Sequence, residues 1–370
     1  MSARPGHAPG RTPVLLVGGI QEDATQVVGL YLQLGLPGAV TVRHVIDAAD
    51  EALTRIVSDA TGVLERVRLN LAHACVTCAI REDIVPTLER LSAQGRWDGV
   101  IACLPLAAEA TQVCRALAWN PGRAPHVAVA AVVTALDGSN LAADLLGEDL
   151  LDERGLATCA EDARGVAEVT SAMVEYADVV CLTRAPAADE LALLGALARP
   201  RVPLLCDPAE LDAAELAAGV HRHPQSEYWV DAVQRGALPR LRSDAVWRLD
   251  LRSDRPFHPQ RLQDHVAALG GGHHRSRGCF WLPSRPQDVC VWDGAGGQAS
   301  IDCRETWGAA KPLTRLTFIG LNADQEARPT VEAAFHDCLL TDEEVARQGC
   351  DWDESWDGLE PWLGPIERIA

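Results

Sequence analysis

Lysine is nearly absent from the sequence. Of its 370 residues only Lys311 is a lysine, so 32 of the 33 basic side chains are arginines. Chemistry that needs a catalytic or phosphate-binding lysine must therefore use this residue or do without one. Apolar runs of about 18 residues are missing too, which excludes a transmembrane helix. The first 13 residues lack the apolar segment of a secretory signal. These absences predict a cytoplasmic protein with no membrane contact.

The charge balance and the cysteines narrow the class of protein further. Acidic residues outnumber basic ones by 52 to 33, which gives a net charge of −19. So acidic a surface repels phosphate backbones, and we expect little direct contact with nucleic acid. The 12 cysteines are scattered rather than spaced as in a disulfide framework. We expect them to be reduced and free to bind metal.

Hydrophobic patterning predicts an α/β domain over residues 11–206. Short apolar runs alternate there with amphipathic stretches, of which 81–94 and 161–177 have helical spacing. This alternation is typical of a parallel sheet covered by helices on both faces. The predicted strands are 13–17, 39–46, 99–104, 126–136, 178–182 and 202–206.

Beyond residue 206 the pattern changes twice. A weakly patterned connector is predicted over 207–243, followed by a smaller α+β domain over 244–345. Residues 346–370 form an acidic tail, which we interpret either as a docking peptide or as an end that folds back on its own domain. Its tryptophans are Trp352, Trp356 and Trp362.

The first predicted strand leads into a segment where nucleotide-binding α/β domains have the phosphate loop G-x-x-x-x-G-K-[ST]. In this chain the initial glycines and the threonine remain, but alanine occupies the lysine position. These residues are Gly18, Gly19, Ala24 and Thr25. Glu22 and Asp23 add two carboxylates, each costing roughly 3 kcal/mol against a phosphate about 5 Å away at an effective dielectric of about 20. We therefore predict that this segment forms an ordinary strand–turn–helix that binds no nucleotide.

A C-x-x-C pair, Cys75 and Cys78, precedes the predicted helix at 81–94, and His73 lies two residues upstream. Thiolates at this spacing reach one tetrahedral zinc ion, and the imidazole could be a third ligand. A helix N-terminus close behind favours the thiolate form. A redox dithiol and an inert pair of core cysteines are the alternatives. Two further histidine pairs could bind metal, although exposed loop histidines are commoner: His221 with His223, and His273 with His274.

Taken in order, these segments resemble the CobW-like family of P-loop GTPases and zinc metallochaperones over residues 13–345. Residues 73–88 (HACVTCAIREDIVPTL) are similar to the family's G-C-x-C-C segment and the R-E-D-L-x-P-x-L that follows it. The resemblance implies a P-loop-NTPase-like parallel-sheet domain followed by a smaller α+β CobW-type C-terminal domain. Other similar segments are 133–156, 166–180, 255–259, 275–282 and 338–344.

The chain departs from the family at three nucleotide motifs. Besides the phosphate loop, the family's E-x-x-G falls on residues 102–105 (ACLP), and its guanine motif N-K-x-D falls on 183–186 (TRAP). Thr77 also replaces the middle cysteine of the family's cysteine motif. We therefore expect no bound GTP, no GTPase activity and no catalytic residues. Zinc is the expected cofactor, at Cys75 and Cys78.

Three functions fit these observations. Resemblance to a branch that is induced by zinc starvation predicts a zinc-responsive pseudo-GTPase that acts as a protein adaptor. Its partner would then be a ribosome hibernation factor or a ribosomal protein. The alternative is a zinc metallochaperone that transfers zinc to a client protein, with or without residual GTPase activity. The third function is a structural partner protein with inert cysteines.

Overall fold

The computed structural model describes residues 10–71, 75–159, 161–324, 327–347 and 357–366. The chain divides into two compact units, which we call the N-terminal unit and the C-terminal unit. The N-terminal unit consists of Met1–Leu141, Asp149–Ala188 and Leu197–Trp229. The C-terminal unit consists of Ala142–Glu148, Asp189–Ala196 and Val230–Ala370.

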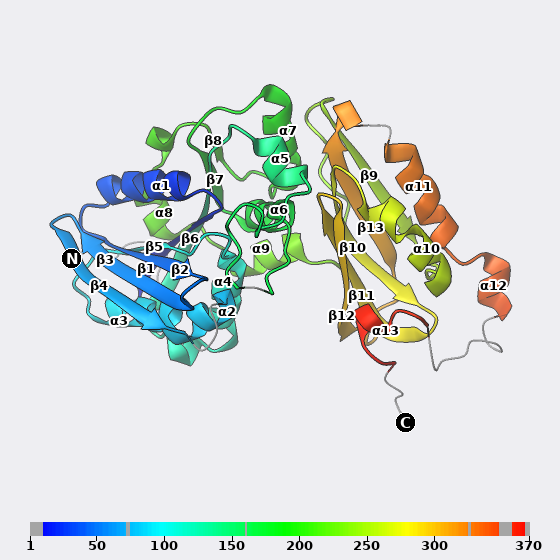
Figure 1. Cartoon of the computed structure of the whole chain (residues 1–370), viewed down its shortest axis with the longest axis horizontal. Coiled ribbons are helices and arrows are strands. Elements are labelled where there is room, and N and C mark those ends of the chain that lie inside the picture. The colour runs from blue at the N-terminus through cyan, green and yellow to red at the C-terminus, as the bar shows by residue number, and fades with distance from the viewer. Residues whose placement is uncertain (1–9, 72–74, 160, 325–326, 348–356, 367–370) are drawn as a thin grey trace. The chain divides into compact units, whose positions relative to one another are not determined.

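An eight-stranded sheet in the order β4-β3-β2-β5-β1-β6-β7-β8 forms the centre of the first unit (Figure 1). The six strands from β2 to β8 pair in parallel, which confirms the predicted α/β class. The central strands of this sheet are apolar because helices bury both of its faces. The strands are β1 (Thr12–Gly19), β2 (Val40–Asp47), β3 (Ala52–Asp59), β4 (Gly62–Asn70), β5 (Val100–Cys103), β6 (Val127–Leu136), β7 (Val179–Leu182) and β8 (Leu204–Leu205).

The antiparallel hairpin β3–β4 at one edge was not predicted. Its residues alternate between half-buried and exposed along β4, as expected of an edge strand with one face in water. Such alternation is weaker in the sequence than the continuous apolar runs of the central strands. The hairpin therefore extends the sheet beyond the parallel core that the apolar runs predicted.

Helices cover the two faces of this sheet. α1 and α8 pack on one face, where Ala24, Val28 and Leu32 of α1 join the core. α3, α4 and α6 lie on the other face. The helices up to Val230 are α1 (Glu22–Gly35), α2 (Val76–Ala79), a π-helix (Ile80–Ile84), α3 (Val85–Ala93), α4 (Ala110–Trp119), α5 (Leu141–Leu146), α6 (Val166–Tyr176), α7 (Ala188–Leu197), α8 (Ala213–Gly219) and α9 (His223–Val230), with short 3-10 turns at Pro121–Arg123 and Pro208–Glu210.

The C-terminal unit contains an antiparallel five-stranded sheet in the order β12-β11-β10-β13-β9. Its core is rich in aromatic side chains, among them Phe257, Phe280 and Phe335. The strands are β9 (Val246–Ser253), β10 (His274–Leu282), β11 (Arg285–Ala295), β12 (Gln298–Thr306) and β13 (Thr314–Leu321). The helices are α10 (Pro259–Gly270), a 3-10 turn (Asn322–Asp324), α11 (Ala327–Cys338), α12 (Asp342–Arg347) and α13 (Glu360–Leu363).

Part of the acidic tail packs on the C-terminal sheet. Asp357 accepts hydrogen bonds from Arg285 Nε and Ser284 Oγ, each 2.8 Å long. Leu359 and Leu363 belong to the core of the unit. Residues 357–366 therefore fold back on their own domain. Trp352 and Trp356 lie outside the described residues, and Trp362 is 54% exposed.

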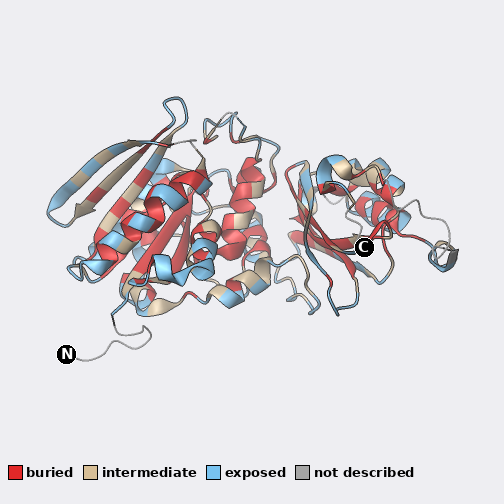
Figure 2. Cartoon of the chain, turned by 90° about the horizontal axis from the view of Figure 1, so that it is seen from below, coloured by how far each residue is buried: buried red, intermediate tan, exposed pale blue. Residues whose placement is uncertain are grey.

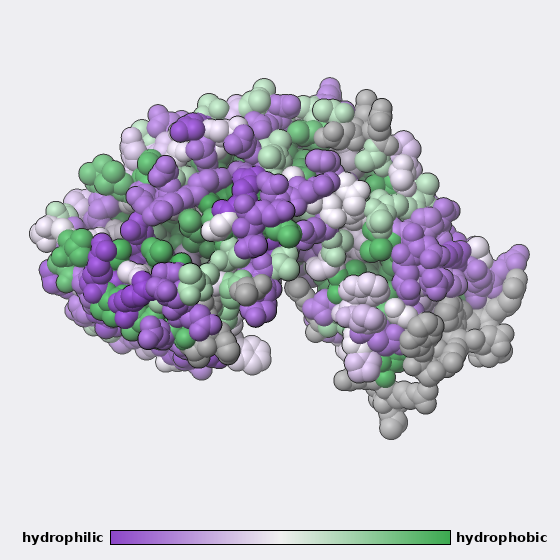
Figure 3. Space-filling model, in the orientation of Figure 1, coloured by the Kyte–Doolittle hydropathy of each residue, from purple (hydrophilic) through white to green (hydrophobic). Residues whose placement is uncertain are grey.

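Buried residues are concentrated on the strands and on the helix faces that meet them (Figure 2). On the visible surface of each unit, hydrophilic side chains predominate, with smaller hydrophobic areas between them (Figure 3). No helix in the described ranges is both long and apolar enough to cross a bilayer.

Candidate functional site

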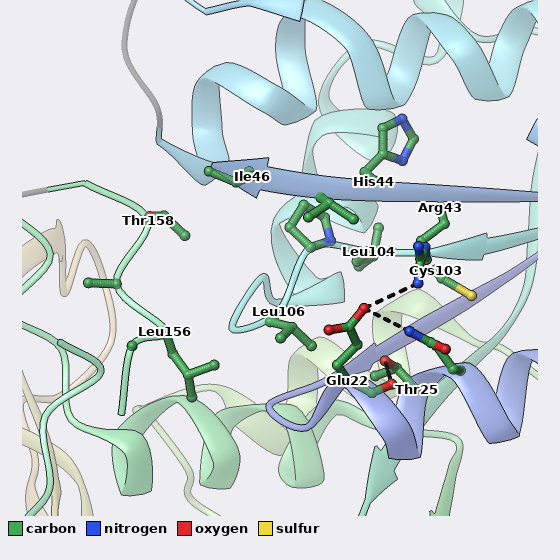
Figure 4. Close-up of a pocket in the computed structure, with 15 residues that line it drawn as sticks. Glu22, Thr25, Arg43, His44, Ile46, Cys103, Leu104, Leu106, Leu156 and Thr158 are labelled. Carbon is green, nitrogen blue, oxygen red and sulfur yellow. Dashed lines mark hydrogen bonds and ion pairs between the residues drawn. The ribbon is translucent and has the colours of Figure 1, made fainter. Parts of the chain in front are cut away.

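A pocket of about 110 Å³ lies at the carboxyl ends of β2 and β5 (Figure 4). This edge of a parallel sheet is where α/β proteins bind their ligands. The start of α1, the segment that follows β5 and the loop at 155–158 complete its wall. The labelled lining residues are Glu22, Thr25, Arg43, His44, Ile46, Cys103, Leu104, Leu106, Leu156 and Thr158.

The degenerate phosphate loop, residues 18–25, borders this pocket. Helix α1 begins inside this loop, at Glu22. Thr25 is buried, and its hydroxyl donates a 2.9 Å hydrogen bond to the Glu22 carbonyl inside the helix. Ala24, at the lysine position, is only 1% exposed and packs in the core. Ala24, at the position where the family has the phosphate-binding lysine, thus faces the core. The hydroxyl of Thr25, which would bind magnesium in the family, is hydrogen-bonded to the backbone of α1 instead.

The glycines of the loop are packed against neighbouring backbone. A Cβ on Gly19 would lie 2.4 Å from the Ala135 carbonyl oxygen and 2.8 Å from Thr25 Cγ2, so only glycine fits there. The Ala107 amide donates a 3.1 Å hydrogen bond to the Gly19 carbonyl. Ala107 has a left-handed φ of 59°, which an alanine adopts only at a cost. Gly19 therefore serves close packing of the loop against the end of β6.

The charged groups nearest the loop are paired with each other. Glu22 Oε1 accepts hydrogen bonds from Gln26 Nε2 at 2.7 Å and from Arg43 Nη1 at 3.3 Å, as the dashed lines in Figure 4 show. Both charged side chains are partly exposed, so the ion pair stabilises the fold by at most about 1 kcal/mol. Arg43 is nevertheless paired with Glu22, whose carboxylate would repel a phosphate in this pocket.

The segment in place of the guanine motif makes contacts of its own. The Arg184 amide donates to the Asp137 carbonyl at 2.9 Å, and the Arg184 guanidinium lies 3.4 Å from the Asp137 carboxylate. The Thr183 hydroxyl also donates to the Asp137 carbonyl, at 3.5 Å. Residues 183–186 thus tie the end of β7 to the end of β6.

The loop at 155–158 is held by Asp162. This carboxylate accepts hydrogen bonds from the amide and hydroxyl of Thr158, at 3.2 and 3.1 Å, and from Arg164 Nε at 2.7 Å. Burial alone would raise its pKa, but the bonds and charge of Arg164 and the Thr158 bonds outweigh burial and lower the pKa of Asp162 to about 2. Arg164 also donates to the Ala107 carbonyl at 3.3 Å, which links this loop to the segment after β5.

Asp162→Asn is expected to remove an acid-dependent part of the stability of the N-terminal unit. Because the folded-state pKa lies below the unfolded value of 3.8, Asp162 stabilises the fold above pH ~4. That contribution, on the order of 1–2 kcal/mol, is lost as the pH falls from about 4 to about 2. Urea unfolding at pH steps from about 6 to about 2 measures it. Asp152→Asn, which changes an exposed aspartate ten residues earlier in the chain, is the control and should leave the pH dependence of the unfolding free energy unchanged.

The structure brings together two of the three predicted metal ligands. Cys75 caps the helical stretch that runs from α2 through α3, and its sulfur accepts the Cys78 amide hydrogen at 3.2 Å. A hydrogen bond between the two thiols, reinforced by burial, raises the pKa of Cys78, and the Arg81 guanidinium 4.0 Å away opposes that shift. His73 lies outside the described residues. In the ranges described, no three histidine, cysteine or acidic side chains are placed to hold a metal ion.

The segment after the cysteines is fixed by a buried network that sequence reasoning missed. Asp83 lies in the π-helix and accepts a 3.0 Å hydrogen bond from His44 Nε2 and another from the Thr87 hydroxyl at 3.2 Å. Arg55 of β3 also pairs with Asp83. Burial lowers the pKa of His44 despite this carboxylate. An acidic residue on the apolar face of a predicted helix was the available signal for this network.

The other histidine pairs have structural partners. His221 Nδ1 is 2.8 Å from Asp178 Oδ2, and His223 Nδ1 is 2.7 Å from the Tyr176 hydroxyl. His274 is buried, with its Nε2 3.0 Å from the Leu269 carbonyl. Neither pair belongs to a three-ligand group among the described residues.

Comparison with known proteins identifies the family. Residues 47–201 match the CobW/HypB/UreG nucleotide-binding domain, and residues 246–339 match the cobalamin synthesis protein cobW C-terminal domain. A protein of Mycobacterium tuberculosis named as a zinc chaperone is 32% identical over 324 residues, covering 84% of this chain and 78% of its own length. The chain therefore belongs to the CobW family, as the resemblance predicted.

More distant relatives carry related names. The zinc-regulated GTPase metalloprotein activator 1 of Dictyostelium discoideum is 21% identical over 343 residues, which cover 81% of this chain and 70% of that protein. Among solved structures, the zinc-bound YjiA GTPase of E. coli is 18% identical, with a TM-score of 0.34 over 89% of this chain and 99% of its own.

Proposed function

We propose that this protein is a zinc chaperone that handles zinc through Cys75 and Cys78 and works without bound GTP. The observation that carries the zinc part is the hydrogen bond from the Cys78 amide to the Cys75 sulfur, which places both thiols at the start of one helical stretch. Two thiolates in this arrangement can bind one tetrahedral ion at about 2.3 Å. Relatives named for zinc support the same assignment.

Within the described ranges only Cys75 and Cys78 are brought together, and a site with fewer than four protein ligands suits transfer better than permanent binding. Structural zinc sites use four protein ligands, whereas open positions allow exchange. Zinc must displace the thiol proton, and the raised pKa of Cys78 makes binding depend on pH. His73, two residues before Cys75 in the sequence, is the candidate for a further ligand.

The absence of GTP is supported by the geometry of the phosphate loop. Ala24 is directed into the core, and the Thr25 hydroxyl is bonded within α1. The match to the family's nucleotide-binding domain begins at residue 47, after this loop. Phosphoryl transfer depends on positioned charges, so a loop without them has no means of catalysis.

Cys75→Ser/Cys78→Ser is expected to lower the zinc stoichiometry of the full chain by one equivalent. Serine keeps the size of each side chain but removes the thiolates that zinc prefers. Titration with zinc against a chromophoric competitor measures stoichiometry and affinity together. Cys103→Ser, a buried single thiol on β5, is the matched control and should leave zinc binding unchanged. Unchanged stoichiometry in the double variant would show that the zinc assignment is wrong.

A protein-adaptor function is the second candidate, in which the chain recruits a ribosome hibernation factor under zinc limitation. The supporting observations are the altered nucleotide motifs, the net charge of −19 and an exposed Trp362 on the C-terminal unit. Acidic surfaces steer association with basic partners, and tryptophan is enriched at binding hot spots. Capture by the tagged chain from zinc-starved lysate, compared with Trp362→Ala, tests this function. Equal recovery of every captured protein with both chains would exclude Trp362 as a docking residue.

A further inference from the structure

A second pair of cysteines lies in the C-terminal sheet. Cys290 of β11 and Cys303 of β12 are directly opposite each other in the antiparallel register. Their sulfur atoms are 3.4 Å apart. Opposed residues of antiparallel strands have Cα separations of about 4.5–5.5 Å, within the range of about 4.4–6.8 Å that disulfides adopt. Beside a register shift at Val289/Cys290, the two sulfur atoms are thus already close to each other, on strands whose pairing suits a disulfide.

The two thiols differ in their surroundings. Cys290 is fully buried in the core of the unit, whereas Cys303 is half-buried. The hydrogen bond from Cys290 lowers the pKa of Cys303 and outweighs the effect of its burial. The same bond, with burial, raises the pKa of Cys290 well above its usual range. Cys303 packs against the edge of the same core but is the less buried of the two, so it is the member of the pair that forms a thiolate.

We propose that Cys290 and Cys303 are a redox-active dithiol that hydrogen peroxide oxidises to a disulfide. The Cys303 thiolate attacks one peroxide oxygen, the O–O bond breaks, and the departing hydroxide takes up a proton to become water. Cys303 is then a sulfenic acid. The Cys290 sulfur attacks the Cys303 sulfur, the S–O bond breaks, and the oxygen leaves as water with the Cys290 proton. Two thiols lose two electrons, and one peroxide is reduced to two waters.

Five other thiols of the described residues have no thiol hydrogen-bonded to them, and their pKa values are raised. Burial raises the pKa of several isolated thiols to about 12, so they are poor nucleophiles at neutral pH. They are Cys103, Cys114, Cys181, Cys279 and Cys338. Cys279 lies in the same sheet and donates to the Leu313 carbonyl, which makes it an internal control.

Disulfide mapping of the full chain tests the proposal. The protein is treated with a modest excess of hydrogen peroxide, quenched in acid, alkylated while unfolded and cleaved on the amino side of aspartates. Cleavage before Asp288, Asp293 and Asp302 places the two cysteines on different peptides. We expect 288–292 to be linked to the peptide that begins at Asp302, with Cys279 still alkylated. Alkylation of both Cys290 and Cys303 after peroxide, or a stable sulfenic acid on Cys303 without the link, would overturn the proposal.

Variants separate the roles of the two sulfurs. Cys290→Ala should leave Cys303 as a sulfenic acid that dimedone traps, formed on the order of tenfold more slowly because the hydrogen bond that favours the thiolate is gone. Cys303→Ser should leave Cys290 unreactive. Cys279→Ser should keep the link, and so should Cys75→Ser/Cys78→Ser, which separates this proposal from the zinc assignment. Loss of the link in either control would count against it, and the mapping of the unaltered chain decides the matter if a variant does not fold.

Discussion

Arg285→Ala is expected to destabilise the C-terminal unit by roughly 3–5 kcal/mol, the usual cost of leaving a buried charge without its partner. The side chains of Arg285 and Asp357 are only 2% and 1% exposed. Arg285 Nε donates to Asp357 at 2.8 Å, and its other nitrogens donate to the carbonyls of Leu363 and Gly364 at 3.2 and 2.6 Å. Alanine removes all these donors while Asp357 stays buried. Urea unfolding followed by tryptophan fluorescence measures the loss.

Two controls define the origin of this effect. Arg255→Ala breaks an exposed pair, 3.8 Å from Asp342, and should cost less than about 1 kcal/mol. The double variant Arg285→Met/Asp357→Leu removes both buried charges and should be more stable than Arg285→Ala, because no lone charge is left in the core. If Arg285→Ala and Arg255→Ala were equally stable, the anchoring of residues 357–366 by Arg285 would be disproved.

GTP with Mg²⁺ is expected to give no binding heat and no turnover with this protein. A phosphate loop normally neutralises the triphosphate with a lysine, and Lys311 lies in the C-terminal unit rather than in this loop. Calorimetry and phosphate release measure binding and hydrolysis, with the E. coli YjiA GTPase in the same buffer as the positive control. A dissociation constant in the low micromolar range, accompanied by turnover, would contradict the proposal.

Restoring the motif gives a sharper test of the same idea. Asp23→Gly/Ala24→Lys supplies the missing glycine and lysine, yet it should not restore GTP binding. Ala24 packs in the core because α1 begins at Glu22, so a lysine there meets apolar side chains instead of phosphate. We expect this variant to be less stable than the unaltered chain, because the ammonium group of the introduced lysine would lie in the core without a charged partner. Tight GTP binding by the variant would show that the loop can rearrange.

The α/β class, the parallel core and the family could be predicted from the sequence. The central strands are continuous apolar runs, since a parallel sheet is buried on both faces, and this periodicity does not depend on distant contacts. The C-x-x-C pair could be found for a similar reason, because the spacing of its two cysteines is local. The hairpin β3–β4 was missed because half-exposed strands carry a weaker pattern.

Contacts between residues that are far apart in the chain could not be predicted from sequence periodicity or spacing. Residues 290 and 303 become neighbours only through the register of β11 and β12, and Asp357 reaches Arg285 across 72 positions of chain. The network around Asp83 likewise joins β2 and β3 to the π-helix.

The sequence by itself determined which side chains the phosphate loop lacks and which thiols lie close enough along the chain to share a metal ion. Only the tertiary structure decided where the remaining groups point. Ala24 packs in the core and the Thr25 hydroxyl is bonded within α1 because this helix begins at Glu22, and two strands bring the sulfur of Cys290 within 3.4 Å of that of Cys303. The physical reason is that local patterns follow from backbone periodicity, whereas the direction of a side chain and its distant partners depend on how the elements pack.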